Sequence, residues 1–172
     1  MSDPDIYRRL AVLERWRDDM ASVEKARPIY AIYDTNAGQS LANNTTTIIN
    51  YEDVIIDPDN LVTVGAAWAF TVPVTGPYLV IAQIAFVSST AWALAERGIL
   101  QGYVNGALRV NFDRKDNFST AATAQVMVLS GAAIVICTAG DTIDIRANQN
   151  TGGSLALDTT SSFNQVYIAK MN

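Results

Sequence analysis

The sequence predicts an all-β sandwich that follows one short N-terminal α-helix. From residue 29 onward, ten short runs rich in Val, Ile, Tyr and Phe follow one another with no helical pattern between them, which is typical of a sandwich, a jelly roll or a barrel. Turn-forming residues separate the runs, and Asn105-Gly106 between two apolar runs is a strong hairpin signal. The expected strands are residues 29–33, 51–56, 67–72, 78–86, 99–104, 107–112, 124–129, 132–137, 142–146 and 163–170.

One turn, one loop and the single cysteine add to this strand pattern. Ser130-Gly131 lies between two apolar runs and indicates a turn. Residues 88–96 lack a strand pattern and are compatible with a short helical loop. Cys137 is the single cysteine and ends an apolar run, so we expect a small buried hydrophobic residue rather than half of a disulfide.

Residues 1–27 carry the signals of a helix. Asp3 is a favourable N-cap, and Pro4 suits the first helical position because the first turn has no use for the N–H that proline lacks. Pro28 disfavours helix at the residue before it and so ends the segment. Five positions follow the 4-3-4-3 spacing of a coiled-coil seam, with an arginine as a polar interruption: Ile6, Leu10, Leu13, Arg17 and Met20.

This helix has two possible uses. In the coiled-coil register, Arg9 and Glu14 occupy positions where opposite charges pair between helices. The seam is only about two and a half heptads long, whereas a stable coiled coil needs about three or four, so the helix would not hold a trimer by itself. We expect either a helix that bundles with its copies or docks into a larger assembly, or an amphipathic helix packed on its own domain.

The composition excludes several classes of protein. Charged residues make up 17% of the chain and apolar residues 49%; because the usual charged share is about 25%, the surface is poor in charge and an oligomer is favoured. The net charge of −5 argues against a nucleic-acid partner, which a basic patch would bind. The opening Met-Ser-Asp-Pro-Asp lacks the basic start of a signal peptide, and no run reaches the ~18 apolar residues of a membrane span. We therefore expect a protein made in a cytoplasm and not inserted into a membrane.

Four segments, in order, resemble a known family. The run Phe70-Thr71-Val72-Pro73-Val74-Thr75-Gly76-Pro77-Tyr78-Leu79-Val80 is similar to the central motif of the globular heads of complement C1q and the related tumour-necrosis-factor-like proteins. Residues 27–31, 140–145 and 162–168 resemble the first strand, the late Gly-Asp with its strand, and the closing strand of that family. The chain departs from the family pattern at Pro77 and at Asn164-Gln165, where Ser-Gly is common.

The resemblance covers residues 27–172. It implies a ten-stranded jelly roll that forms tight threefold trimers, and a binding head without enzymatic activity. On this basis the chain divides into an N-terminal helix, residues 1–27, for trimerisation or anchoring, and a jelly-roll head, residues 28–172.

The residues themselves offer no catalytic site. The chain contains no histidine, which is the commonest general base, the usual partner in serine and cysteine triads and a frequent zinc ligand. Its Gly-containing turns match no phosphate-binding loop. We expect Asp141 and Asp144 to be solvated charges at a strand edge rather than a glycosidase pair. The sequence therefore predicts a protein that is not an enzyme and holds no cofactor.

An acidic loop is a candidate calcium site. Calcium prefers several oxygen ligands close together, and Asp57, Asp59 and Asn60 supply three of them within one turn. The loop lacks the ligand spacing of an EF-hand. The same residues are typical of an Asx turn without a metal, which is the interpretation we favour.

A second group of residues is a candidate for binding sugar. An exposed Trp92 together with Asn148, Asn150 and Thr151 would provide the aromatic face and short polar groups that a sugar ring needs. The alternative for Trp92 is a place in the core or in a subunit interface, where large aromatic residues are usually found.

These expectations favour a structural protein of a bacteriophage particle. A trimeric jelly roll with a small helical foot can fold in the host cytoplasm and then be fixed to other virion proteins. Residues 6–17 are also similar to the helical openings of small phage structural proteins. The leading hypothesis is a capsid decoration trimer or a head fibre. The alternative is the receptor-binding tip of a tail fibre that recognises host surface glycan, and a glycan hydrolase is disfavoured because histidines and a deep acid pair are missing.

Overall fold

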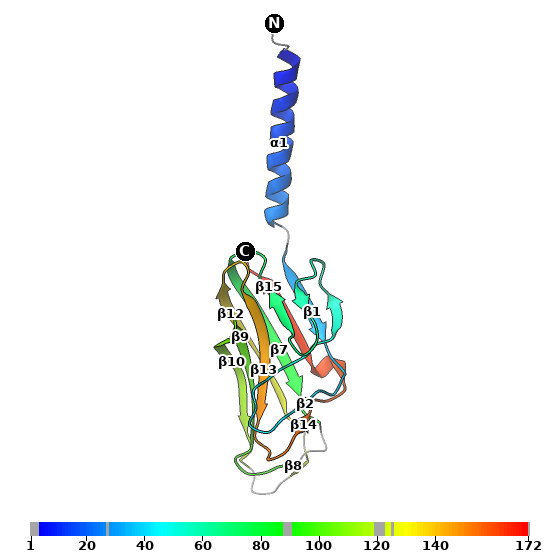
Figure 1. The fold of residues 1–172 in the computed structure, drawn as a ribbon, viewed down its shortest axis with the longest axis vertical. Coiled ribbons are helices and arrows are strands. Elements are labelled where there is room, and N and C mark those ends of the chain that lie inside the picture. The colour runs from blue at the N-terminus through cyan, green and yellow to red at the C-terminus, as the bar shows by residue number, and fades with distance from the viewer. Residues whose placement is uncertain (1–3, 27, 88–90, 119–122, 125, 172) are drawn as a thin grey trace.

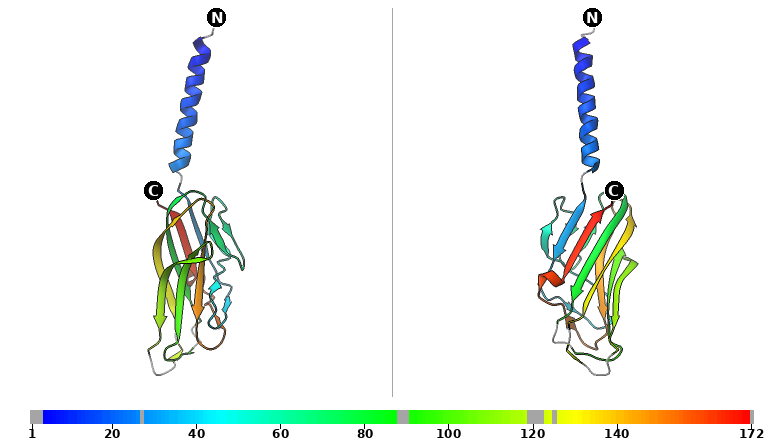
Figure 2. Two further views of the ribbon diagram at one scale, coloured as in Figure 1. Left: turned by 60° about the vertical axis from the view of Figure 1, so that its left-hand side comes forward. Right: turned by 180° about the vertical axis from the view of Figure 1, so that it is seen from behind.

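The computed structural model consists of a β-sandwich head and a helix that projects from one of its ends (Figure 1). It describes residues 4–26, 28–87, 91–118, 123–124 and 126–171. The helix, α1 (Pro4–Ala26), continues the long axis of the head, as the further views confirm (Figure 2). We call the end of the head nearest α1 the helix end, and the opposite end, where β8 (Ala91–Trp92) lies, the distal end.

The head contains two antiparallel sheets. The first sheet has the order β12-β7-β15-β1-β4, and the second has the order β10-β9-β13-β6-β5, with β3 also paired to β13. The strands of the first sheet are β1 (Tyr30–Asp34), β4 (Asp53–Ile56), β7 (Gly76–Ala85), β12 (Val128–Cys137) and β15 (Gln165–Lys170). Those of the second are β3 (Thr47–Ile48), β5 (Val62–Thr63), β6 (Ala69–Thr71), β9 (Arg97–Val104), β10 (Ala107–Asp116) and β13 (Thr142–Gln149).

The connections between the sheets make this sandwich a jelly roll. The chain crosses from one sheet to the other between β6 and β7, between β7 and β9, between β10 and β12, and again before β13 and β15. The two strand orders contain five strands each, so the predicted ten-stranded jelly roll is confirmed. Smaller elements complete the head: β2 (Ser40–Leu41) pairs with β14 (Leu155–Ala156), β8 pairs with β11 (Thr123–Ala124), and η1 (Ser161–Phe163) is a 3₁₀ turn.

The core lies between the two sheets and is rich in aromatic residues. Trp68 packs edge-on against Tyr51, with ring centroids 5.3 Å apart, and against Tyr33 at 6.2 Å. Successive residues of a strand point to opposite faces, and β7 accordingly buries every second side chain from Tyr78 to Ile84. Cys137 is buried without a disulfide, as the sequence predicts, and burial raises the pKa of its thiol.

Local signals in the sequence predict some turns correctly and others wrongly. Pro4 begins α1 as expected, whereas Asp3 lies outside the described residues. Asn105 and Gly106 have φ values of 51° and 73°, and they join β9 to β10 because a two-residue hairpin turn of this type requires positive φ at both positions.

The turn predicted at Ser130-Gly131 is wrong, because β12 passes through both residues. Gly131 lies there because β12 approaches β10 closely: a Cβ at this position would come within 2.5 Å of the carbonyl oxygen of Phe112. The helical loop predicted at residues 88–96 is also wrong in its described part, since Ala91–Trp92 is a strand. Residues 88–90 lie outside the described ranges.

We expect Gly131→Ala to destabilise the head, because the added methyl group would push apart the β10–β12 edge of the sandwich. Overpacking of this kind costs about 1–3 kcal/mol, and the loss can be measured by urea unfolding. Gly153→Ala is the matched control, because a Cβ at Gly153 meets no atom within 4 Å. Equal stability of the two variants would show that the close approach of β10 and β12 is unimportant.

Candidate assembly face

The outward face of the first sheet is apolar toward the helix end. The strand registers arrange its outward-facing side chains in rows that cross β1, β15, β7 and β12. One row is Tyr30, Ala169, Leu79 and Ile134; the next is Ile32, Tyr167, Ile81 and Ala132; Pro77 and Ile136 pair beyond them. We call these ten residues the assembly face.

The assembly face leaves large apolar side chains in contact with solvent. Ile81, Ile134 and Ile136 are 42%, 56% and 75% exposed. An antiparallel sheet usually places polar residues on the face that is turned away from the core, whereas this sheet is apolar on both faces. A contiguous apolar surface of this kind marks an interaction site.

A polar row limits the assembly face on the side of the distal end. It consists of Asp34, Gln165, Gln83 and Ser130, which are register partners across the same four strands. Partial burial raises the pKa of Asp34 above its ordinary value, and the neighbouring carboxylate of Asp53 adds to this shift. The apolar surface therefore ends at a row of hydrogen-bonding groups.

A shallow hollow of about 190 Å³ lies where the apolar and polar rows meet. Ile32, Ile81 and Tyr167 form its apolar side, and Gln83 and Gln165 form its polar side. A side chain from a neighbouring molecule could enter this hollow and gain both apolar contact and a hydrogen bond.

The edge formed by β10 and β12 is a second apolar surface. Two contacts close the sandwich there: Lys115 Nζ donates to the carbonyl oxygen of Val128 at 2.5 Å, and the N–H of Ser130 donates to Asp113 Oδ2 at 3.1 Å. Leu108, which is 47% exposed, lies on β10 of this edge, and Ile134 and Ile136 lie on β12. The edge therefore adjoins the assembly face, shares Ile134 and Ile136 with it, and extends its apolar surface to Leu108.

The helix also presents its apolar residues to solvent. Ile6, Leu10, Leu13 and Met20 of the predicted seam are each at least half exposed. Arg17 pairs with Asp18 of the same helix at 3.2 Å. The alternative that α1 packs on its own head is thus wrong for residues 6–20, whose side chains are all exposed. No helix in the described ranges is both long and apolar enough to span a bilayer.

Of the two interpretations of Trp92, the core position is confirmed and the exposed sugar-stacking residue is wrong. Trp92 is completely buried and packs edge-on against Phe86, with ring centroids 5.4 Å apart. Its carbonyl oxygen accepts a hydrogen bond from Asn117 Nδ2. The ring is therefore part of the hydrophobic core at the distal end of the head.

The polar residues predicted to accompany Trp92 have internal partners. Asn150 Oδ1 accepts the N–H of Arg97 at 2.6 Å, and Thr151 donates to Gln149 Oε1 from both its N–H and its hydroxyl at 2.7 Å. Asn148 lies on β13 opposite Ile99. These residues hold the loop after β13, and the structure does not join them to an exposed tryptophan.

The predicted calcium ligands are arranged around a hydrogen-bonded turn. Asp57 Oδ1 accepts the N–H of Leu61 at 3.0 Å, and Oδ2 accepts the N–H of Val62 at 3.1 Å and the hydroxyl of Tyr33 at 2.9 Å. Burial, followed by this bond to Asp57, raises the pKa of Tyr33 to about 12.

Asn60 has a φ of 51° in the same turn, and Asp59 is not without an interaction partner. The described residues contain no cluster of three or more His, Cys, Asp or Glu side chains suited to a metal ion. Calcium binding by Asp57, Asp59 and Asn60 stays a prediction that this hydrogen bonding does not favour.

Of the two aspartates Asp141 and Asp144, the second differs from the expectation of a solvated charge. Asp144 is buried and forms an ion pair with Arg146, whose Nε lies 2.5 Å from Asp144 Oδ1 and whose guanidinium stacks on Tyr103. Asp141 accepts hydrogen bonds from the N–H of Thr138 and then from Asn105, and these bonds lower its pKa. A general acid needs a raised pKa, so Asp141 does not fit that role.

Two buried polar residues organise the loops and were missed by the sequence reasoning. Asn164 Oδ1 accepts the N–H of Ala85 at 3.0 Å, and its Nδ2 donates to the carbonyl oxygen of Asp158 at 2.7 Å. Gln149 Nε2 donates to the carbonyl oxygens of Leu41 and Gly153. The departure from the family pattern at Asn164 was the available signal, because a buried amide stands where the family commonly has the smaller serine.

Comparison with known proteins identifies the fold. No protein-family model matches the chain, and no curated protein is a significant match to its sequence. Solved structures similar to the head include the TNF Eiger of S. frugiperda, murine APRIL and the globular domain of zebrafish complement 1qA protein. Their sequence identities are 18%, 13% and 15%, and their TM-scores are 0.60, 0.57 and 0.56.

The matches cover 85%, 84% and 83% of this chain, and 94%, 100% and 96% of the other chains in the same order. The head has a jelly roll of the TNF and C1q type. The expectation drawn from the resemblance of four short segments is therefore confirmed for the fold, and identities this low speak for the fold alone.

We expect Trp92→Ala to destabilise the head by about 3–5 kcal/mol, the usual cost of removing a large buried aromatic side chain. Thermal unfolding measures the loss. Trp16→Ala is the matched control, because Trp16 lies on α1 and is 63% exposed, so it should leave the unfolding of the head unchanged. A Trp92→Ala head as stable as the parent would contradict the core position of this ring.

Proposed function

We propose that the chain is a non-enzymatic structural and binding protein that works as a homotrimer. The assembly face carries this proposal, because four neighbouring strands expose two full rows of apolar side chains in register. In the trimer, the part of the β10–β12 edge toward the helix end, which carries Leu108, covers the assembly face of the next subunit. Removing apolar surface from water contributes about 25 cal/mol per Å², so this contact favours association.

The difference between the two surfaces supports a closed ring. A contact between an edge and a face is heterologous, and repeated heterologous contacts close into rings when the rotation between subunits allows it. A threefold ring places the three assembly faces around a central axis. The jelly-roll likeness described above supports this arrangement. Because β1 lies in the assembly face, the start of each head, next to α1, would then lie close to the same axis.

The helix is then suited to bundle with its copies and to attach the trimer to a larger assembly. Its seam residues Ile6, Leu10, Leu13 and Met20 are exposed on the isolated subunit, and three parallel copies would cover them. Arg17 interrupts this seam, so the bundle should be weak and depend on the head. The helix end of the head thus serves assembly and attachment, and the distal end faces away from the larger assembly.

Within this function, we propose that the larger assembly is a bacteriophage particle, on which the trimer serves as a capsid decoration protein or a head fibre. The support is the similarity of residues 6–17 to helical openings of small phage structural proteins, together with a helix that the head leaves uncovered. Other virion proteins would be the partners of the helix.

Ile81→Glu should break the trimer, because it would place three carboxylates in the apolar contact. An uncompensated charge in such a site costs about 3–5 kcal/mol. Light scattering should show about three times 18.6 kDa for the parent and a lower mass for the variant at the same concentration. The control is Val64→Glu, the same change at an exposed residue outside the assembly face. A parent protein that is a stable monomer at micromolar concentration would refute the proposal.

Deletion of residues 1–26 should leave a folded, trimeric head that no longer joins its particle. The head has its own core and assembly face, whereas the described side chains of α1 are exposed to solvent. Circular dichroism and light scattering test the fold and the trimer, and co-sedimentation with purified particles tests attachment. If the truncated head is unfolded or monomeric, the helix is part of the folding unit and the attachment role is wrong.

A further inference from the structure

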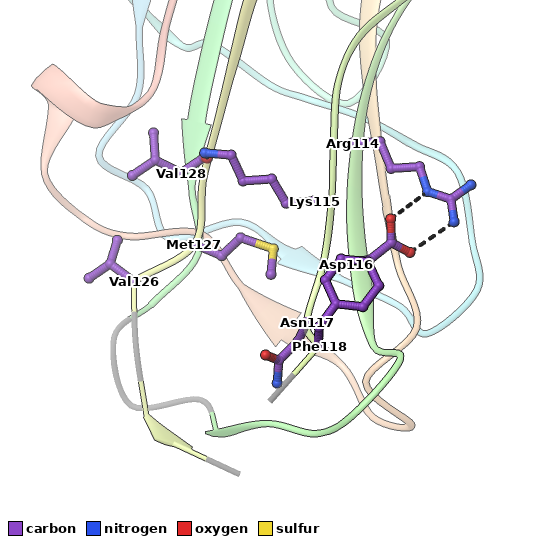
Figure 3. Close-up of a pocket in the computed structure, with 8 residues that line it drawn as sticks. All are labelled: Arg114, Lys115, Asp116, Asn117, Phe118, Val126, Met127 and Val128. Atoms are coloured by element: carbon purple, nitrogen blue, oxygen red, sulfur yellow. Dashed lines mark hydrogen bonds and ion pairs between the residues drawn. The ribbon is translucent and has the colours of Figure 1, made fainter. Parts of the chain in front are cut away.

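We propose that a hollow near the distal end of the head, between the ends of β10 and β12, binds the ring of a saccharide. The hollow has a volume of about 430 Å³, within the ~300–1,000 Å³ typical of small-molecule sites. Arg114, Asp116, Phe118 and Met127 line it and are drawn in Figure 3. This site is separate from the assembly face, so the proposal does not depend on the trimer.

Phe118 provides an aromatic surface for stacking. The residue is 82% exposed, which is unusual for a large apolar side chain on a head whose other described aromatic rings are mostly buried. In the view of Figure 3 the ring lies between the Met127 side chain and the carboxylate of Asp116. A pyranose ring has one face made of C–H groups, and this face is the part of a sugar that gains from contact with an aromatic ring.

An ion pair provides hydrogen-bonding groups next to the ring. Arg114 donates to the carboxylate of Asp116 from Nε at 2.9 Å and from Nη2 at 2.8 Å. A guanidinium has five N–H donors and a carboxylate has about four acceptor positions, so both groups keep capacity for the hydroxyls of a ligand. The bond from Arg114 is also the main reason why the pKa of Asp116 is lowered, and the carboxylate therefore remains an acceptor in mild acid.

The charges in the hollow favour a neutral ligand. Arg114 and Asp116 neutralise each other, and the ammonium group of Lys115 contacts Asp113 at 3.8 Å and donates to the carbonyl oxygen of Val128. An anionic ligand such as a phosphate would have to break one of these ion pairs. A purely apolar ligand would leave the polar wall unpaired, which is unfavourable. A neutral polyhydroxylated ring matches both the aromatic surface and the polar wall.

The site is held in place by the core of the distal end. Asn117, between Asp116 and Phe118, is buried, and its Nδ2 donates to the carbonyl oxygens of Trp92 and Ala93. These bonds fix the backbone on which Phe118 is carried, so the ring is presented from an ordered support. Preorganisation of this kind lowers the entropic cost of binding.

The hollow should stay open when subunits associate. The hollow uses Val128, the first residue of β12, and Arg114 to Asp116, the last three residues of β10. The apolar part of the β10–β12 edge lies at the opposite ends of both strands, with Leu108 near the start of β10 and Ile134 and Ile136 near the end of β12. The polar row through Ser130 lies between the two regions. Each subunit would therefore carry one accessible saccharide site near the end of the head opposite the helix.

Titration of the full-length protein with D-glucose, D-galactose and N-acetyl-D-glucosamine, followed by amide NMR shifts, tests this proposal. We expect at least one of these sugars to cause saturable shifts confined to residues 114–118 and 126–128 and their neighbours. Phe118→Ala should weaken that binding about tenfold, the effect of losing an aromatic contact worth about 1.4 kcal/mol. Asp116→Asn should also weaken it, because the variant loses the ionised acceptor.

Phe163→Ala is the matched control, because Phe163 is an exposed phenylalanine on η1, outside the hollow. It should leave sugar binding unchanged. Light scattering on the same samples reports the oligomeric state, so a failure of the trimer is distinguished from a failure of this site. The proposal is overturned if none of the three sugars binds, if the shifts lie elsewhere, or if Phe118→Ala binds as the parent does.

Discussion

The apolar character of both faces of the sheet β12-β7-β15-β1-β4 is the constraint on which the rest of this structure depends. One face supplies half of the core, with Tyr78, Val80 and Ile168 fully buried. The opposite face repeats the pattern with Ile32, Ile81 and Tyr167 in register across neighbouring strands. A two-layer sandwich can bury only one face of each sheet, so in the proposed trimer a third layer comes from a neighbouring subunit.

The β10–β12 edge is the part of the fold that can supply this third layer. Gly131 lets β12 approach the backbone of Phe112 closely, and the Lys115 and Ser130 contacts hold the distal part of the same edge shut. The edge is therefore a well-defined surface rather than an open pair of strands. Closing the edge protects a sheet against uncontrolled pairing, while its exposed isoleucines remain available for an ordered contact.

The distal end of the head is organised by buried amides rather than by a metal or a disulfide in the described ranges. Asn164 and Gln149 bind backbone groups of loops that are far apart in the sequence. Buried polar groups are stable only when their hydrogen bonds are satisfied. The side-chain amides of these two residues bond to backbone groups of the loops, so that both the amides and the backbone groups have partners. The support that Asn117 gives to Phe118 follows the same rule, and it links the core around Trp92 to the proposed saccharide site.

The proposed functions lie at the two ends of the molecule. The assembly face and the helix share one end, so the association and attachment that we propose would use neighbouring surfaces. The saccharide site lies near the other end, beyond the polar row of Asp34, Gln165, Gln83 and Ser130. A particle that holds the helix would present the distal end to its surroundings.

The sequence by itself determined the class of fold, the N-terminal helix and the Asn105-Gly106 hairpin, because alternation, helix-start signals and turn chemistry are local properties. Only the tertiary structure decided which residues are exposed. The sequence left Trp92 open between core and surface, and it is buried. Asp144 looked like a surface residue and is buried, and Gly131 looked like a turn and lies within a strand. The reason is that exposure depends on strand register and on contacts between segments far apart in the chain. For the same reason the assembly face could not be read from the sequence, since its rows exist only once four separate strands are aligned.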